Sequence, residues 1–356
     1  MTPRYREALR EASRNVWSGT AHTVRWCVLL AFVGSALAWM DAASVRGLVD
    51  DAVGYLDSRG ATWALQAPGR VSGRACEALN QATGVVRAGA VRAEAVPVTT
   101  VALPKAPVPL FSVTPGFLRV VGSSSTGLSV TDAVADRYGL DPPDQWGTTL
   151  GSVTVDGVFP YPSDGRQPGL GFAVLAPTPA DQLFDQCWVT VWPTDQRTVN
   201  LVQTALVHDG LPPGTSEVKL SQVNPSFATL FNGHALFANR LTRWAPAGAL
   251  LAGCLIGFAS VRTRRLEHAS ALHTGLPKTF VLVQSLVEAL SWAVPAAVLG
   301  TVAVLVAVRG ASAETSQIAL IGARPLVAAA AGAVLGTLLA AALVREKQLF
   351  SIFKSR

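Results

Sequence analysis

Residues 280–308 read FVLVQSLVEALSWAVPAAVLGTVAVLVAV, and Glu288 is the single charged residue among them. A helix needs about 20 predominantly apolar residues to cross the hydrocarbon core of a bilayer. This stretch therefore predicts a transmembrane helix. Three further apolar stretches have comparable length, at 23–44, 245–262 and 321–344. The sequence thus predicts an integral membrane α-helical protein with four transmembrane helices.

The composition agrees with a membrane protein. Of the 356 residues, 50% are hydrophobic and 15% are charged, whereas soluble domains carry about 25% charged residues. Residues 46–243 contain 14 Lys and Arg against 16 Asp and Glu, and the remaining residues contain 15 against 7. The net charge of +6 therefore comes from segments that flank the apolar stretches. This distribution indicates membrane topology, and we expect a lipid bilayer and no nucleic acid as partner.

The basic residues also predict the orientation of the chain. Lys and Arg cluster in 1–22, in 263–279 and in the tail 345–356. Because cytoplasmic segments next to spans are enriched in Lys and Arg, all three are predicted to be cytoplasmic. Residues 45–244 and the short loop 309–320 then lie outside. We expect a multi-pass protein of the inner or plasma membrane with both chain ends in the cytoplasm.

The residues before the first span predict an amphipathic helix. Apolar residues recur there at helical spacing, at Tyr5, Ala8, Leu9 and Ala12. Such a helix can lie on the inner leaflet, and an ordinary solvated helical turn is the alternative. A cleaved signal peptide is disfavoured, because the apolar stretch that follows exceeds the usual length of about 7–15 residues and three more spans come after it.

The outer segment 45–244 predicts a large α+β extracytoplasmic domain between the first and second spans. In 61–100, a strand precedes a helix that Ser72 can cap, and another strand follows. A second βαβ unit is predicted near 187–222. Residues 101–170 are rich in Pro and Gly, and they predict a β-rich insertion between the two units.

The four cysteines fall into two classes. Cys27 and Cys254 lie inside predicted spans, where we expect them to serve as packing residues. Cys76 and Cys187 lie in the outer domain, one in each βαβ unit. An oxidising exterior permits a disulfide between these two, and two buried free cysteines are the alternative.

The sequence contains no signature of an enzyme. No Gly-x-x-x-x-Gly-Lys-[Ser/Thr] motif occurs, so we expect no nucleotide site in this chain. The five histidines are scattered, and His268 and His273 lack the spacing of a two-histidine metal site. The serine-rich residues 123–127 lack the Gly-x-Ser-x-Gly pattern of a hydrolase. We therefore predict no catalytic residue, no metal site and no cofactor bound by this chain.

The loop between the second and third spans has a pattern of its own, RRLEHASALHTGLPKTF at residues 264–280. Apolar residues recur there at steps of three or four, at Leu266, Ala269, Leu272 and Leu276. The remaining positions carry the polar side chains of Arg265, Glu267, His268 and His273. This pattern predicts a short amphipathic cytoplasmic helix that ends at Gly275 and Pro277.

This loop resembles that of the FtsX/MacB-like family of ABC transporter permeases, the type VII or mechanotransmission class. The family pattern is Arg-Glu-x-Ala-x-x-x-x-x-Gly, then a basic residue, then an apolar stretch with a Glu and spaced glycines. The residues that match are Glu267, Ala269, Gly275, Lys278, Glu288 and Gly300. Leu272 departs from the pattern, since the family often has Arg there, and Leu276 and Pro277 replace small residues. The resemblance covers 1–45 and 244–356, and the outer domain only in outline.

The resemblance implies partners and roles. It implies a separate ABC ATPase subunit that binds ATP and Mg, and a dimer with a second permease copy or a paralogue. We expect the inner loop to couple the chain to the ATPase through Arg265, Glu267, Leu272, Gly275 and Lys278.

Two kinds of intramembrane residue are further candidates. Glu288 is an ionisable residue within a span, where such groups are costly and face protein or water, and the resemblance favours a structural clamp over an ion path. Small-xxx-small motifs occur at Gly253 and Gly257 and at Gly332 and Gly336. The resemblance makes the first two spans the expected dimer seam, with packing residues Gly34, Gly253 and Gly257.

The expected function is that of a permease subunit. It would relay ATPase-driven motion from cytoplasmic coupling helices to an extracytoplasmic domain that handles a peptide, lipid or antibiotic-like substrate. The alternative is an FtsX-like transmembrane regulator that activates a cell-wall hydrolase. A membrane-anchored enzyme is disfavoured, because no catalytic signature is present.

Overall fold

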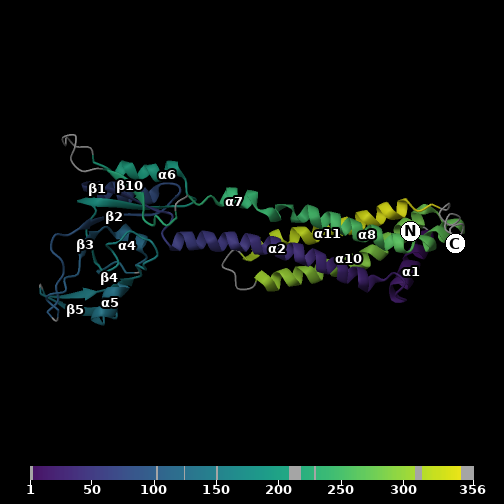
Figure 1. Ribbon diagram of the computed structural model, residues 1–356, viewed down its shortest axis with the longest axis horizontal. Coiled ribbons are helices and arrows are strands. Elements are labelled where there is room, and N and C mark those ends of the chain that lie inside the picture. Colours follow the sequence, from purple (N-terminus) through teal and green to yellow (C-terminus); the bar gives the residue numbers. More distant parts are fainter. Residues whose placement is uncertain are drawn as a thin grey trace. The chain divides into compact units, whose positions relative to one another are not determined.

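The computed structural model describes residues 3–101, 103–123, 125–149, 151–207, 218–227, 230–308 and 315–345 (Figure 1). It divides into two compact units. We call Met1–Asp50 with His234–Arg356 the helical unit, and Asp51–Gly233 the α+β unit. Residues 309–314, half of the predicted outer loop at 309–320, and residues 346–356 of the tail at 345–356 lie outside the described residues.

Among the described residues of the helical unit, four helices are long and apolar enough to cross a membrane. The elements of this unit are α1 (Pro3–Trp17), α2 (Thr23–Asp57), α7 (Gly233–Asn239), η3 (Leu241–Trp244), α8 (Ala245–Thr263), α9 (Arg265–His273), α10 (Lys278–Val308) and α11 (Thr315–Ala342). The candidate spans are α2, α8 with η3, α10 and α11, and the α+β unit is inserted between the first and the second. The predicted fold class is therefore confirmed.

The first long helix extends well past the predicted span. Helix α2 continues from residue 44 to Asp57, and its last seven residues belong to the α+β unit. Hydropathy falls there because Asp50 and Asp51 are charged, yet charge does not end a helix. The guanidinium Nε of Arg46 lies 3.7 Å from the carboxylate of Asp50, one turn further along α2. Such i,i+4 ion pairs favour the helical conformation.

Helices α8 and α11 pack with their backbones in contact. A Cβ atom on Gly253 or Gly257 would meet the backbone of Ala329 or Ala333 on α11. On α11, a Cβ atom on Gly336 would likewise meet the backbone of Cys254. Gly253 lies against Ala329, and Gly257, one turn later on α8, lies against Ala333, one turn later on α11. The two helices therefore run parallel. The two small-xxx-small motifs therefore face each other within one chain.

The three glycines of the predicted dimer seam have contacts within this chain, and the seam itself stays a prediction. Gly253 and Gly257 are covered by α11 of the same chain, and Gly34 faces the side chains of Leu326 and Ala329, also on α11. All three glycines thus serve close packing inside the helical unit. A small-residue stripe permits close approach of any helix, and α11 occupies the stripe here.

In the described part of the α+β unit, the strands form one eight-stranded sheet and a two-stranded hairpin. Its strands are β1 (Thr62–Ser72), β2 (Val85–Ala93), β3 (Leu110–Val113), β4 (Ser129–Thr131), β5 (Asp144–Thr148), β6 (Gly151–Val155), β7 (Gly157–Phe159), β8 (Val174–Pro177), β9 (Leu183–Val191) and β10 (Lys219–Gln222). The strand order of the large sheet is β10-β1-β9-β2-β3-β8-β4-β7, and β5 pairs with β6. Its helices are α3 (Gly73–Ala78), η1 (Leu79–Gln81), α4 (Pro115–Val121), α5 (Asp132–Tyr138), α6 (Gln196–Asn200) and η2 (Leu201–Ala205).

The two βαβ units interlock. Strands β1 and β2 both pair antiparallel with β9, which lies between them. Strands β9 and β10 in turn both pair antiparallel with β1. Each unit is thus a split βαβ unit whose gap holds a strand of the other, as in ferredoxin-like sheets. The Ser72 hydroxyl accepts a hydrogen bond from the backbone N–H of Ala75 and caps α3.

The segment 101–170 differs from the expected β-rich insertion in two ways. It contains two short helices, α4 and α5, that the sequence analysis did not predict. Each ends at a glycine with positive φ, Gly122 (φ 85°) and Gly139 (φ 64°), a common helix stop. Strands β3, β4 and β7 of this segment also extend the main sheet instead of forming a separate one.

The large sheet is covered on both faces. Along β9, Cys187 and Val189 contribute to one buried cluster, whereas Trp188 between them contributes to another. The first cluster includes residues of α3 and η2, and the second includes residues of α4. This alternation follows from the twofold period of a strand. On the first face, Cys76 of α3 and Cys187 of β9 form a disulfide bond, with Cα atoms 5.9 Å apart.

Candidate functional site

A buried polar cluster joins α1, α9 and α10 near the end of the helical unit where α9 lies. Its centre is Glu288, which is 7% exposed. The carboxylate accepts hydrogen bonds from Arg264 (2.7 Å), Asn15 (2.7 Å) and Gln284 (3.2 Å). We call these four residues the inner polar cluster. A carboxylate within a span needs such partners, because a lone charge there is strongly disfavoured.

Arg264 connects the cluster to α9. It lies at the junction between α8 and α9, and its guanidinium is 2.7 Å from Glu288 and 2.7 Å from Glu267. In the sequence, Arg264 is one of several basic loop residues, and this role was not predicted. The signal was present, since a Glu in an apolar span requires a cation nearby and Arg264 is at the adjoining helix end.

The structure places the predicted coupling residues in two environments. Arg265, Glu267, Gly275 and Lys278 are exposed. Leu272 is 7% exposed and packs in a cluster with residues of α8, α10 and α11. The Leu272 side chain therefore lies inside its own chain, and its part in coupling to the ATPase stays a prediction.

The predicted faces of α9 are also shifted. Leu266, expected on the apolar face, is 46% exposed, whereas His268, expected on the polar face, is 3% exposed. The reason is the inner polar cluster, since Arg264 must face Glu288 and residues one turn further along a helix lie on the same face. Ion pairing thus overrides the hydrophobic pattern in this short helix.

Helix α1 packs against α10. Ala8 and Ala12, two of the residues predicted to form its apolar face, are fully buried there, while Leu9 is 37% exposed. Asn15 adds the hydrogen bond to Glu288. Small side chains and one amide therefore hold α1 on the helical unit.

A cavity of about 300 Å³ opens between α1, α9 and α10 beside the inner polar cluster. His268 and Glu267 of α9 line it, together with Glu7 and Glu11 of α1. Burial lowers the pKa of the His268 imidazole below 6.5; the charge of Arg264 lowers it further, and Glu288 and Glu267 act in the opposite direction. The ring is accordingly neutral at pH 7.

A second buried ion pair lies elsewhere in the helical unit. Asp41 of α2 is 1% exposed, and its carboxylate is 3.2 Å from Arg240, which lies between α7 and η3. The guanidinium of Arg240 also stacks on the ring of Phe237, 3.8 Å from its centroid. This link was not predicted from the sequence, and it fixes the segment before α8 against α2.

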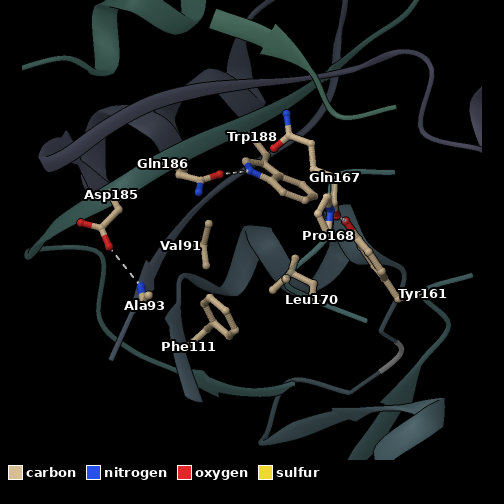
Figure 2. A pocket seen from close by; sticks show the side chains of 11 residues that line it. Val91, Ala93, Phe111, Tyr161, Gln167, Pro168, Leu170, Asp185, Gln186 and Trp188 are labelled. Carbon is tan, nitrogen blue, oxygen red and sulfur yellow. Dashed lines mark hydrogen bonds between the residues drawn. The ribbon is translucent and has the colours of Figure 1, made fainter. Parts of the chain in front are cut away.

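The α+β unit has a small cavity of about 80 Å³ between strands and the segment 161–170 (Figure 2). Trp188 lies in its wall and donates a hydrogen bond to Gln186, and the Asp185 carboxylate accepts one from the backbone of Ala93, as Figure 2 shows. Burial raises the pKa of Tyr161, on the same wall, to about 12. A shallower hollow of about 500 Å³ adjoins it.

This cavity carries no set of groups arranged for catalysis. The polar side chains around it are satisfied by each other and by backbone, and the Tyr161 hydroxyl donates to the carbonyl of Gln167 at 2.7 Å. Among the described residues, no group of three or more His, Cys, Asp or Glu side chains could hold a metal ion.

Comparisons with known proteins give likeness in structure only. No protein-family model matches the sequence, and no curated protein matches it. The periplasmic region of MacB from Actinobacillus actinomycetemcomitans aligns over 46% of this chain and 90% of that structure, with 7% identity and a TM-score of 0.34. The extracellular domain of the ABC-type transporter YknZ from Gram-positive bacteria aligns over 40% of this chain and 92% of that structure, with 12% identity and a TM-score of 0.28.

Proposed function

We propose that this protein is the transmembrane subunit of an ABC transporter of the FtsX/MacB-like, mechanotransmission class. The observation that carries the proposal is the inner polar cluster. It ties α1, α9 and α10 together through Glu288 and Arg264, while Arg265, Glu267 and Lys278 remain exposed on or beside α9. A helix held rigidly between two spans, with charged side chains outward, is suited to receive force from a partner.

The plan of the chain supports the same function. Four candidate spans carry one large α+β unit between the first and second. Both chain ends and α9 are assigned to the cytoplasm on the basis of Lys and Arg enrichment. The α+β unit is then extracytoplasmic, where oxidising conditions allow the disulfide between Cys76 and Cys187.

Motion of α9 would be transmitted to the α+β unit by helices that move as rigid bodies. The close backbone contact of α8 and α11 makes these two helices one stiff pair. Helix α2 runs without a break to Asp57. Its residue Tyr55 is 3% exposed, and its ring contacts those of Phe227 and Phe231 within the α+β unit. A continuous helix with an aromatic anchor at its end can transmit displacement.

The partners follow from this assignment. ATP and Mg²⁺ would bind a separate ATPase subunit, and a second copy of this chain or a paralogue would complete the transporter. The α+β unit would handle a peptide, lipid or antibiotic-like substrate outside the membrane. The exposed residues Arg265, Glu267, Gly275 and Lys278 would contact the ATPase, and buried Leu272 would support α9 from within.

Isolation of the tagged chain from its native membrane in a mild detergent tests the proposal. We expect a Walker-motif ATPase in stoichiometric amount, and ATPase activity that the permease stimulates. Glu267→Ala with Lys278→Ala should lower that stimulation, whereas Lys105→Ala, also at an exposed position but in the α+β unit, should not. A folded chain that recovers no ATPase would overturn the proposal, and a co-purifying cell-wall hydrolase would favour the regulatory function.

A further inference from the structure

The cavity between α1, α9 and α10 has a lining of mixed apolar and charged residues. Its volume is about 300 Å³, at the lower end of the range of about 300–1,000 Å³ for small-molecule sites. The lining residues are Glu7, Glu11, Asn15, Arg264, Glu267, His268, Ala271, Leu276, Phe280 and Gln284. The lining includes the apolar residues Ala271, Leu276 and Phe280 as well as charged and polar ones, so it suits an occupant with an apolar stem and a polar end.

The charged residues of the lining are predominantly acidic. Three carboxylates, those of Glu7, Glu11 and Glu267, face a single guanidinium. That guanidinium, of Arg264, is already paired with Glu267 and with Glu288 behind the wall. The carboxylates of Glu7 and Glu11 therefore give the cavity a negative potential that Arg264 does not offset. Glu11 also lies 3.4 Å from Arg14, but that arginine is 74% exposed and outside the lining.

His268 supplies an independent sign of a missing ligand group. It is 3% exposed and lines the cavity, yet its imidazole makes no hydrogen bond to any described residue. Buried polar groups are nearly always hydrogen-bonded. Because burial lowers its pKa, the ring is neutral and one of its nitrogens is a free acceptor. The other ring nitrogen carries an N–H that can donate, so a ligand group in the cavity can donate to the acceptor nitrogen of His268 while its N–H remains available to water or to an acceptor.

We propose that this cavity receives a lysine or arginine side chain of the cytoplasmic ATPase partner. The cationic end would meet Glu7 and Glu11 and donate to His268, and its aliphatic stem would lie along Ala271, Leu276 and Phe280. A zwitterionic lipid is disfavoured, because its phosphate, close to its ammonium, would be repelled by the same carboxylates. The inference rests on the proposed function, since it names a contact with the same ATPase.

Charge-neutral variants of α1 test the acidic wall. The purified full-length chain, in detergent, is titrated with the ATPase that co-purifies with it. The double variant Glu7→Gln with Glu11→Gln should bind on the order of tenfold more weakly. The matched control is Arg6→Gln with Arg10→Gln, on exposed positions of the same helix outside the cavity, and it should bind as the parent does.

The outcomes separate the two proposals. If the parent chain binds no ATPase, the proposed function fails. If the parent binds and the glutamine variant binds equally well, or the arginine control loses as much affinity, the cavity is not the contact and the inference fails.

Two further variants probe the interior of the cavity. His268→Phe removes the acceptor and should weaken binding, whereas His268→Gln keeps an acceptor and should restore most of it. A photoreactive amino acid in place of Ala271 should crosslink to an ATPase peptide with Lys or Arg next to the attachment point. Crosslinking to lipid alone, in native membranes where the ATPase is bound, would overturn the inference.

Discussion

Replacing Glu288 with Gln removes the charge at the centre of the inner polar cluster and keeps the shape of the side chain. The carboxylate is buried and accepts three hydrogen bonds, one of them from the guanidinium of Arg264, which is 8% exposed. In the variant, that guanidinium loses its buried counter-ion. Removing one partner of a buried ion pair costs about 3–5 kcal/mol. We expect E288Q to lower the free energy of unfolding of the helical unit by about 3 kcal/mol.

Glu267 provides a matched control. Its carboxylate bonds to the same guanidinium at 2.7 Å, but its side chain is 58% exposed. Because water screens and solvates an exposed pair, such a contact contributes about 0–1 kcal/mol. The variant E267Q should therefore cost less than about 1 kcal/mol. Each variant removes one carboxylate charge that pairs with Arg264, and the two carboxylates differ in how deeply they are buried.

Thermal unfolding in detergent, followed by tryptophan fluorescence, measures both variants. Trp26 and Trp292 are 5% and 2% exposed within the helical unit and report on its packing. With about 2–4 °C per kcal/mol for a unit of this size, E288Q should lower Tm by about 6–12 °C and E267Q by less than about 4 °C. The double variant R264M with E288L should recover most of the loss. Equal effects of E288Q and E267Q would refute the reasoning.

Three further changes test other parts of the structure. Gly253→Ala should lower the free energy of unfolding by about 1–3 kcal/mol, because the added methyl group meets the α11 backbone. Gly248→Ala, which has open space around it on the same helix, should leave that free energy unchanged in a thermal unfolding experiment. A variant Gly253→Ala that changes only the oligomeric state would place Gly253 in a dimer seam instead. Replacing Cys76 and Cys187 with Ala should cost the α+β unit about 2–5 kcal/mol in denaturant unfolding, since their bond closes a loop with a sequence separation of 111; unchanged stability would argue against the bond. The lowered pKa of His268 means that the folded chain binds a proton at this ring less readily than the unfolded chain does. The stabilisation of the folded chain by neutral His268 is therefore complete above about pH 6.5 and is lost as the pH falls. Thermal unfolding across this range should show a decline that H268Q removes, and a variant that declines as the parent does would contradict the assignment.

Local patterns in the sequence determined many of the individual elements of this protein, although not the short helices α4 and α5. The four apolar stretches predicted the spans because a bilayer leaves no water to satisfy the backbone, so length and hydropathy suffice. The cap at Ser72 similarly follows from the residue and its neighbours. The order of strands was beyond such patterns, because β9 inserts between β1 and β2 from about a hundred residues away. Pairing of that kind depends on the whole sheet.

The partners of the buried glycines and of Glu288 were decided by the tertiary structure. Gly253 and Gly257 form a stripe that any helix can approach, and only packing shows that α11 of the same chain occupies it. The position of Glu288 within a span indicated that a cation must lie nearby, but the sequence offered several basic residues. The structure shows that Arg264, at the junction of α8 and α9, is the one that pairs with it. A sequence determines which groups cannot be left alone in an apolar interior. The packed chain determines which neighbour satisfies them, because that depends on distances that sequence spacing does not contain.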